Sequence, residues 1–355
     1  MAKRKHNFNA GPGALPMAVL QTVQRDLLDQ GGHGLSVMEM SHRSAAYAPI
    51  IDGARAAIGE LYDLPDTHEV LFLQGGASLQ FAMVPLNLGS GGAYVNTGVW
   101  ATKALKEARI IGEAHEIWSS AAENFGHVPG PEVALAVPEG APYLHFTSNN
   151  TIYGTQWDHV PPADAPLVGD LSSDFMSRPV DVTPFDLIYA GAQKNAGPSG
   201  VTVIIARKTV SRRFGGDERT PKILRYATHA SQDSMFNTPP TFAIYVVGLV
   251  ARWVQAQGGL EGMARTNEAK ARLLYEAIDR SPGFEGMARP DSRSRMNVTF
   301  TTGDKARDAA FVQRAEALDM IGLKGHRDLG GLRASIYNAV PMASVEALVD
   351  LIRSV

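Results

Sequence analysis

Short apolar runs alternate with amphipathic stretches through the middle of the chain. Apolar runs that predict buried strands lie at 70–74, 93–98, 143–150, 165–171, 186–193 and 200–207. Helical patterns follow the first two of these runs, after GGAS and over 99–109. Strands that are apolar along their whole length are typical of a sheet covered by helices on both faces, and strand–helix alternation favours parallel pairing. The pattern therefore predicts an α/β fold with a mainly parallel sheet.

The pattern changes from about residue 265 onward. A helix at 267–280, a strand at 296–302, another helix, the segment GLRASIYNAV and a final helix predict a smaller α+β domain. The first 15 residues are loop-like and suit packing against either part. We assign them to the small domain. The predicted division is then a large domain at 16–262 and a small domain made of 1–15 and 263–355.

Composition narrows the class of protein. Hydrophobic residues make up 45% and charged residues 19% of the 355 positions, and the net charge is -3. These values fit a soluble globular protein and predict neither nucleic acid nor anionic lipid as a partner. The apolar stretch at 241–254 contains Arg252 and fits a buried helix better than a membrane span. The basic start lacks an apolar run, so we expect no signal peptide and a cytoplasmic location.

The absence of cysteine excludes several kinds of chemistry. With no cysteine in the chain, disulfides, thiolate metal ligands and a cysteine nucleophile are all ruled out. Metal binding by the histidines is also not expected, because neither His42 nor His326 has a carboxylate or histidine at ligand spacing.

The most informative polar residue is Lys194, at the end of the apolar run DLIYAGAQ and before NAGPSG. Ligand sites in open α/β sheets gather at the carboxyl ends of strands. A desolvated lysine there is suited to form a Schiff base with pyridoxal phosphate (PLP), and the small residues around it leave room for a flat ring. An isolated lysine at such a point is, however, more often a surface residue.

Asp170 strengthens the hypothesis because it ends another apolar run, APLVGD. A carboxylate beside a protonated pyridine nitrogen keeps the PLP ring an electron sink. Taken alone, Asp170 is more often a cap or turn residue. The order of the two residues, each at a strand end, is more informative than either one.

A phosphate site is predicted where the run 70–74 turns into a helix. Gly75 and Gly76 permit a tight turn, and the amides of Ala77 and Ser78 then open the helix, which suits a dianion. Most such turns merely begin a helix, so this feature is weak by itself. Trp100, just after another strand, is placed to stack on a ring, although ordinary packing explains it equally well.

Long and unusual segments of the chain resemble those of the phosphoserine aminotransferases, PLP enzymes of the fold-type I, class V aminotransferase group. The matching segments span nearly the whole chain and include NFNAGPGALP, SHRS, SSDFMSRP, GAQKNAGPSG, FNTPPT and GHRDLGGLRASIYNA. The resemblance implies transfer of an amino group from L-glutamate to 3-phosphohydroxypyruvate, giving O-phospho-L-serine and 2-oxoglutarate, as in serine biosynthesis. It leaves open whether the related substrate of vitamin B6 (pyridoxine) biosynthesis is also accepted.

The resemblance also implies roles for residues of this sequence. Lys194 would form the Schiff base, Asp170 would pair with the pyridine nitrogen and Trp100 would stack on the ring. Further cofactor contacts are implied for Gly76, Ala77, Ser78, Thr151 and Gln193, and for Asn237 and Thr238 supplied by the second subunit of a homodimer. Arg333 would clamp the substrate α-carboxylate, and the second anionic end would be read by a cluster of His42, Arg43, His326 and Arg327.

Two positions depart from the pattern of some family members. Ser78 and Leu79 stand where some members have arginine and glycine, and Ala10 stands where some have serine. The first difference weakens one side-chain contact to substrate, and the second leaves only a backbone contact.

Two other functions are compatible with parts of the sequence. Another class V aminotransferase, acting on serine or alanine with glyoxylate or pyruvate, would not need a pocket for a dianion. A non-catalytic small-molecule or nucleotide-binding α/β protein would leave Lys194, Asp170 and Arg333 unexplained, and no Gly-Lys-Ser/Thr follows the glycine turn.

Overall fold

A computed structural model describes residues 4–355 of the chain, and its centre is a seven-stranded sheet. The strands lie in the order β2 (His68–Leu73), β10 (Thr202–Arg207), β9 (Phe185–Gly191), β8 (Leu167–Asp170), β5 (Leu144–Thr147), β3 (Gly92–Asn96) and β4 (Ala114–Ser119). Only β10 runs antiparallel to its neighbours. The prediction of an α/β fold with a mainly parallel sheet is therefore confirmed.

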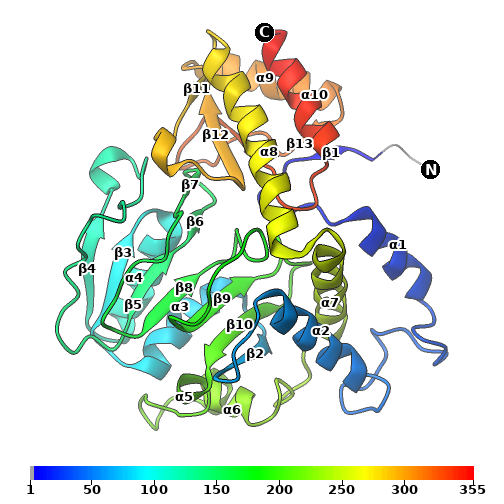
Figure 1. Cartoon of the computed structure of the whole chain (residues 1–355), viewed down its shortest axis with the longest axis vertical. Coiled ribbons are helices and arrows are strands. Elements are labelled where there is room, and N and C mark those ends of the chain that lie inside the picture. Colours follow the sequence, from blue (N-terminus) through cyan, green and yellow to red (C-terminus); the bar gives the residue numbers. More distant parts are fainter. Residues whose placement is uncertain (1–3) are drawn as a thin grey trace.

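Except at the edge strand β4, both faces of this sheet are buried, which explains why the other six strands are apolar along most of their length. Val70 and Phe72 face a core with the helices α2 (Ala48–Leu61) and α7 (Thr241–Ala256). Leu71 and Leu73 face a second core with α3 (Gly76–Leu88) and α4 (Val99–Ile111). The apolar stretch at 241–254 is the buried helix α7. We call the sheet and these helices the central-sheet part (Figure 1).

The C-terminal part has a hydrophobic core of its own. A small antiparallel sheet of β11 (Glu285–Gly286), β12 (Asn297–Thr301) and β14 (Leu332–Ser335) packs with α9 (Lys305–Ala317) and α10 (Met342–Arg353). The N-terminal segment joins this part: β1 (His6–Asn7) pairs with β13 (Met320–Ile321), and Phe8 is fully buried in the core.

One long helix, α8 (Gly259–Arg280), connects the two parts and rises from the sheet toward the C-terminal part in Figure 1. Its first residues, including Leu260 and Met263, pack in the core of the central sheet, whereas Leu274 and Ile278 pack in the C-terminal core. The predicted domain boundary at 262/263 lies inside this helix, and the division into domains stays a prediction.

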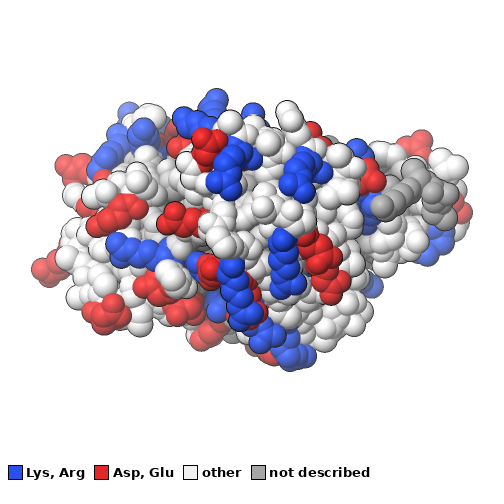
Figure 2. Space-filling model, turned by 90° about the horizontal axis from the view of Figure 1, so that it is seen from above, with Lys and Arg blue, Asp and Glu red and all other residues white. Residues whose placement is uncertain are grey.

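The remaining elements are short or lie at the surface. They are the helices α1 (Met17–Asp26), α5 (Lys208–Ser211) and α6 (Tyr226–Ala230), three 3-10 turns (Ala121–Glu123, Lys222–Leu224 and Pro290–Ser292), and the hairpin of β6 (Asn149–Asn150) and β7 (Thr155–Gln156). No helix of the described residues is long and apolar enough to cross a bilayer. On the face shown in Figure 2, basic and acidic side chains are interspersed.

Most of the predicted strands are shorter in the structure. The run 143–150 leaves the sheet after Thr147: Ser148 N still donates to Asp170 O (3.0 Å), but Asn149 and Asn150 pair with β7. The segment 331–340 is a strand only at 332–335. After Thr147 the chain thus turns from the central sheet into the β6–β7 hairpin, a change that the apolar pattern does not reveal.

Candidate active site

Five strands that point in one direction bring the predicted site residues to one edge of the sheet. These strands are β2, β9, β8, β5 and β3. β9, β8, β5 and β3 are parallel to one another, and β2 points the same way because both β2 and β9 are antiparallel to β10, which lies between them. The residues found at or just after their carboxyl ends are Gly76, Lys194, Asp170, Thr151 and Trp100. Parallel topology thus gathers groups that are up to 118 positions apart in the sequence.

Lys194 lies between a hydroxyl and an aromatic ring. Its Nζ donates to Thr151 Oγ1 at 2.6 Å and stands 5.1 Å from the centroid of the Trp100 ring. Burial lowers the pKa of Lys194 to about 8; the Asp170 carboxylate opposes this effect, and the positive charge of Arg333 adds to it. A larger fraction of this amine is therefore unprotonated at neutral pH than for an ordinary lysine, which favours its role as a nucleophile.

Asp170 is a buried carboxylate, only 4% exposed, whose hydrogen bonds leave one oxygen free. Ser172 N (3.0 Å) and Ser172 Oγ (2.6 Å) both donate to Oδ1. Burial raises the pKa of Asp170, while the charge of Lys194 and the hydrogen bonds from Ser172 hold it down. Oδ2 remains available to a cationic ring nitrogen.

The glycine turn after β2 adopts the backbone that the sequence suggested. Gly75 (φ 88°) and Gly76 (φ 65°) both lie in the left-handed region, and a Cβ on Gly75 would meet Leu79 Cδ2 at 2.5 Å. Because α3 begins at Gly76 without a side-chain cap, the amides of its first turn, including those of Ala77 and Ser78, have no intrahelical acceptors. Such a terminus suits a phosphate group.

Arg333, on β14, brings a guanidinium from the C-terminal part to the same place. Its Nη1 donates to Thr151 O at 3.2 Å, and its Nε is buried without a partner among the described residues. Burial lowers the pKa of Arg333. The free Nε and remaining N–H groups are donors that a carboxylate accepts in pairs.

His326 and Lys103 add two further nitrogen donors to this region. Burial lowers the pKa of His326; Asp328, 3.4 Å from Nδ1, opposes this, and the charges of Arg333, Arg327 and Lys103 add to it. Lys103 lies on α4 with its Nζ 4.6 Å from the centroid of the Trp100 ring. Lys103 was not predicted from the sequence; its position three residues after Trp100, one helical turn further on, is the signal that was available.

Four of the predicted residues are not brought to Lys194 by the contacts within this chain. His42 and Arg43 lie in the loop before α2 and contact each other, with Arg43 Nε 3.3 Å from His42 Nε2. Thr238 O accepts from Gln74 Nε2 at 2.9 Å. Asn237 lines a cavity of about 300 Å³ beside the glycine turn. Their predicted roles, including service to a second subunit, remain predictions.

The N-terminal segment packs directly against the lysine segment, and sequence reasoning did not place it there. Gly13 N donates to Gln193 O at 2.8 Å, and a Cβ on Gly13 would lie 2.5 Å from Lys194 O. Tyr337 Oη donates to Ala10 O at 2.7 Å. The GPG sequence at 11–13 was the only local signal of such a close approach.

The chemistry of this donor set matches PLP. The aldehyde, the pyridine nitrogen and the phosphate of that cofactor would meet Lys194, Asp170 and the first turn of α3, respectively. Trp100 Nε1 and Arg333 Nε are buried and have no hydrogen-bond partner in residues 4–355, so both donors are free to bind a ligand. Within the same residues no group of histidine, aspartate or glutamate is arranged to hold a metal ion.

Comparison with known proteins agrees with this geometry. The family model described as Aminotransferase class-V matches residues 5–348. The chain belongs to the class V aminotransferases and, within them, to the phosphoserine aminotransferase family. It is 50% identical over 350 residues to the phosphoserine aminotransferase of Bacillus subtilis (strain 168), covering 98% of this chain and 96% of the relative.

Solved structures extend the similarity to the fold. Phosphoserine aminotransferase from Bacillus circulans subsp. alkalophilus superposes with a TM-score of 0.96 at 47% identity, covering 99% of this chain and 98% of that one. PLP-bound phosphoserine aminotransferase from Trichomonas vaginalis gives a TM-score of 0.93 at 35% identity, covering 99% and 100%. The family recognised from the sequence is therefore confirmed, and it indicates that the chain is a PLP-dependent aminotransferase.

Proposed function

We propose that this enzyme transfers the amino group of L-glutamate to 3-phosphohydroxypyruvate, producing O-phospho-L-serine and 2-oxoglutarate for serine biosynthesis in the cytoplasm. The observation that carries the proposal is the position of Lys194, a buried amine with a pKa lowered to about 8, between Trp100 and Thr151 and beside Asp170. The relatives named phosphoserine aminotransferase support the choice of substrates.

The residues of the chain divide the chemical work. When bound, PLP supplies an aldehyde that condenses with amines and a ring that withdraws electrons from the substrate α-carbon. Lys194 Nζ would hold the cofactor and, as a free amine, would take the proton from the substrate α-carbon and return it as general base and acid. Asp170 Oδ2 would keep the ring nitrogen protonated, and Thr151 Oγ1, which accepts from Lys194 Nζ, would position the lysine amine.

Substrate recognition falls to the cations on the other side of the site. Arg333 binds the α-carboxylate that both substrates share, because its planar guanidinium matches the two oxygens. Lys103, His326 and Arg327 surround the second anionic end, which is a phosphate in one substrate and a carboxylate in the other. A substrate such as alanine offers nothing to these cations, so the cluster favours the phosphoserine reaction over the alanine or serine reactions of other class V aminotransferases.

The cofactor assignment is tested with sodium borohydride. The purified enzyme should be yellow, lose the colour on reduction and carry the reduced adduct on Lys194, as mass spectrometry of peptides would show. A protein that stays colourless with added PLP would contradict the proposal.

The substrate assignment is tested by comparing amino donors to 2-oxoglutarate. O-phosphoserine should exceed serine and alanine in kcat/KM. Lys103→Ala should lower this value for O-phosphoserine about tenfold or more, the effect of one lost charge-assisted hydrogen bond. Lys106→Ala on the exposed face of the same helix is the matched control. Equal kcat/KM values for alanine and O-phosphoserine would contradict the assignment.

We further propose a homodimer in which Asn237 and Thr238 reach the partner's cofactor phosphate. Mixing the inactive Lys194→Ala variant with an Asn237→Ala/Thr238→Ala variant shows whether Asn237 and Thr238 act in the partner's site or in the site of their own chain. If the residues act across the interface, a mixed dimer contains one intact site and activity returns. If they act within their own chain, both sites of the mixed dimer are defective and activity stays low.

A further inference from the structure

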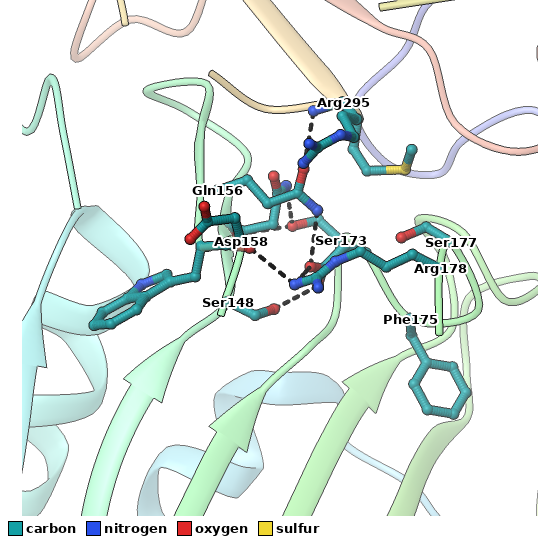
Figure 3. Close-up of polar contacts among 12 residues, drawn as sticks. Ser148, Gln156, Asp158, Ser173, Phe175, Ser177, Arg178 and Arg295 are labelled. Carbon is teal, nitrogen blue, oxygen red and sulfur yellow. Dashed lines mark hydrogen bonds and ion pairs between the residues drawn. The ribbon is translucent and has the colours of Figure 1, made fainter. Parts of the chain in front are cut away.

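A cavity of about 530 Å³ lies between α8 and the central-sheet part, and none of the residues assigned to the active site lines it. Its walls come from three regions: the residues 156–158 and 177–179, one face of α8, and the pair Arg295 and Met296. Figure 3 shows that Gln156, Arg178 and Arg295 lie close to one another. Cavities that hold small metabolites have volumes of about 300–1,000 Å³.

The charges around this cavity favour an anion. Four arginines and two carboxylates line it: Arg178, Arg265, Arg272 and Arg295 against Asp158 and Glu268. Both carboxylates already have partners, since Glu268 accepts from Arg295 Nε and Asp158 accepts from His159 Nδ1 at 2.7 Å. In the described part of the chain neither Arg265 nor Arg272 forms an ion pair. Seven positions apart, these two arginines share one face of α8, about 10 Å apart along its axis.

Three residues that line the cavity each carry a buried polar atom without a partner among residues 4–355: Ser177 Oγ, Arg178 Nε and Asn267 Oδ1. Ser177 is 2% and Asn267 1% exposed. Arg178 Nε can only donate. Asn267 Oδ1 can only accept, because Nδ2 of the same amide donates to Ser177 O (3.1 Å) and Asn338 Oδ1 (2.7 Å), which fixes its orientation. A ligand that satisfies the lining must therefore offer both an acceptor and a donor.

The wall that carries Arg178 is held rigidly. Gln156 Nε2 donates to Asp174 Oδ2 (3.0 Å), while Gln156 Oε1 accepts from Arg295 N (2.9 Å). Arg178 Nη2 donates to Trp157 O at 2.8 Å, and Ser148 Oγ donates to the other oxygen of Asp174 (Figure 3). Since these side chains are already ordered, a ligand would lose little free energy in ordering them.

We propose that this cavity is a binding site for a small hydroxy acid with at least two carboxylate groups. The carboxylates bind the free guanidinium groups of Arg265 and Arg272 and accept from Arg178 Nε. The hydroxyl donates to Asn267 Oδ1. Such a ligand connects the central-sheet part to α8 and is chemically distinct from the amino-acid and oxo-acid substrates, which Arg333 binds elsewhere.

Citrate is a suitable probe, and tricarballylate, which is citrate without the hydroxyl, is its control. Titration calorimetry on the PLP-loaded enzyme should give a Kd for citrate of about 1 mM or below, and about tenfold weaker binding to an Arg265→Gln/Arg272→Gln variant. Arg280→Gln, an exposed arginine near the end of the same helix, should bind citrate as the wild type does. Crystals soaked in citrate should show it between Arg272 and Arg178.

Four results would overturn the proposal. They are no citrate binding at about 10 mM, equal affinity of the wild type and the double variant, tricarballylate binding as tightly as citrate, and displacement of citrate by an equal concentration of inorganic phosphate. Equal binding of tricarballylate would show that the site does not recognise the hydroxyl. Displacement by phosphate would show that the cavity binds anions without selectivity. None of these outcomes depends on turnover, so the proposal fails or succeeds separately from the proposed aminotransferase activity.

Discussion

Replacing Lys270 with methionine should become more destabilising as the pH rises above 7. Lys270 lies on α8, is 0% exposed, and its Nζ donates to the carbonyl oxygens of Ile336 (2.9 Å), Tyr337 (2.7 Å) and Val340 (3.2 Å). These carbonyls belong to the segment after β14 that also carries Tyr337 and Asn338. The lysine therefore holds this segment to the helix that joins the two parts of the molecule.

Two opposing free energies set the size of the effect. In the methionine variant Tyr337 O still accepts a hydrogen bond from Val340 N, so only the carbonyls of Ile336 and Val340 lose the hydrogen bond that Lys270 donates to them. Leaving each of these unpaired costs about 1–3 kcal/mol, or about 2–6 kcal/mol together. Burial lowers the pKa of Lys270 from 10.5 to about 7. Below pH 7 the wild type therefore carries a cost of up to about 5 kcal/mol, at about 1.4 kcal/mol per unit, which methionine removes.

The sign of the pH dependence follows from proton binding. Between pH 7 and pH 10.5 the unfolded lysine is protonated while the folded one is increasingly neutral, so the unfolded state binds more protons and wild-type stability rises with pH. The methionine variant lacks this contribution. The free energy of unfolding of the wild type, minus that of the methionine variant, should therefore increase by about 2–3 kcal/mol from pH 7 to pH 9.

Urea unfolding followed by circular dichroism at pH 7, 8 and 9 measures this difference. Lys305→Met, at an exposed position at the start of α9, serves as the control and should show no such widening. A constant or narrowing difference would refute the reasoning, because it would show that the three carbonyl dipoles keep Lys270 charged above pH 9.

Three further predictions concern the site itself. Gly13→Ala should cost about 1–3 kcal/mol of stability through overpacking, because the new Cβ would lie 2.5 Å from Lys194 O. Gly53→Ala, whose Cβ would meet only the flexible end of Arg252, should not carry this cost. Equal melting temperatures of the two variants would contradict this prediction. Thr151→Val should lower kcat about tenfold through loss of the hydrogen bond to Lys194 Nζ, and Thr151→Ser should restore it; full activity of the valine variant in steady-state assays would argue against a positioning role. In cofactor-free protein, the rate of PLP uptake measured by absorbance should rise to about pH 8 and then level off, because burial lowers the pKa of Lys194 to about 8; a rate still climbing through pH 9 would disprove it.

The sequence by itself predicted an α/β fold with a mainly parallel sheet and placed Lys194 and Asp170 at the ends of strands. Asp170 is the last residue of β8 and Lys194 lies three residues after β9, so the apolar runs were enough to locate both residues. The glycine turn was predictable for the same reason, since a left-handed backbone at Gly75 and Gly76 depends on their lack of a side chain. The long family-specific segments then indicated the reaction.

Only the tertiary structure decided which distant segments complete the site. Ala10 and Tyr337 are 327 positions apart yet form a hydrogen bond, and Gly13 packs on the backbone of Lys194. Arg333 reaches Thr151 from a separate core. Such contacts depend on how helices and cores pack against one another, and neither local propensity nor periodicity in the sequence records that packing.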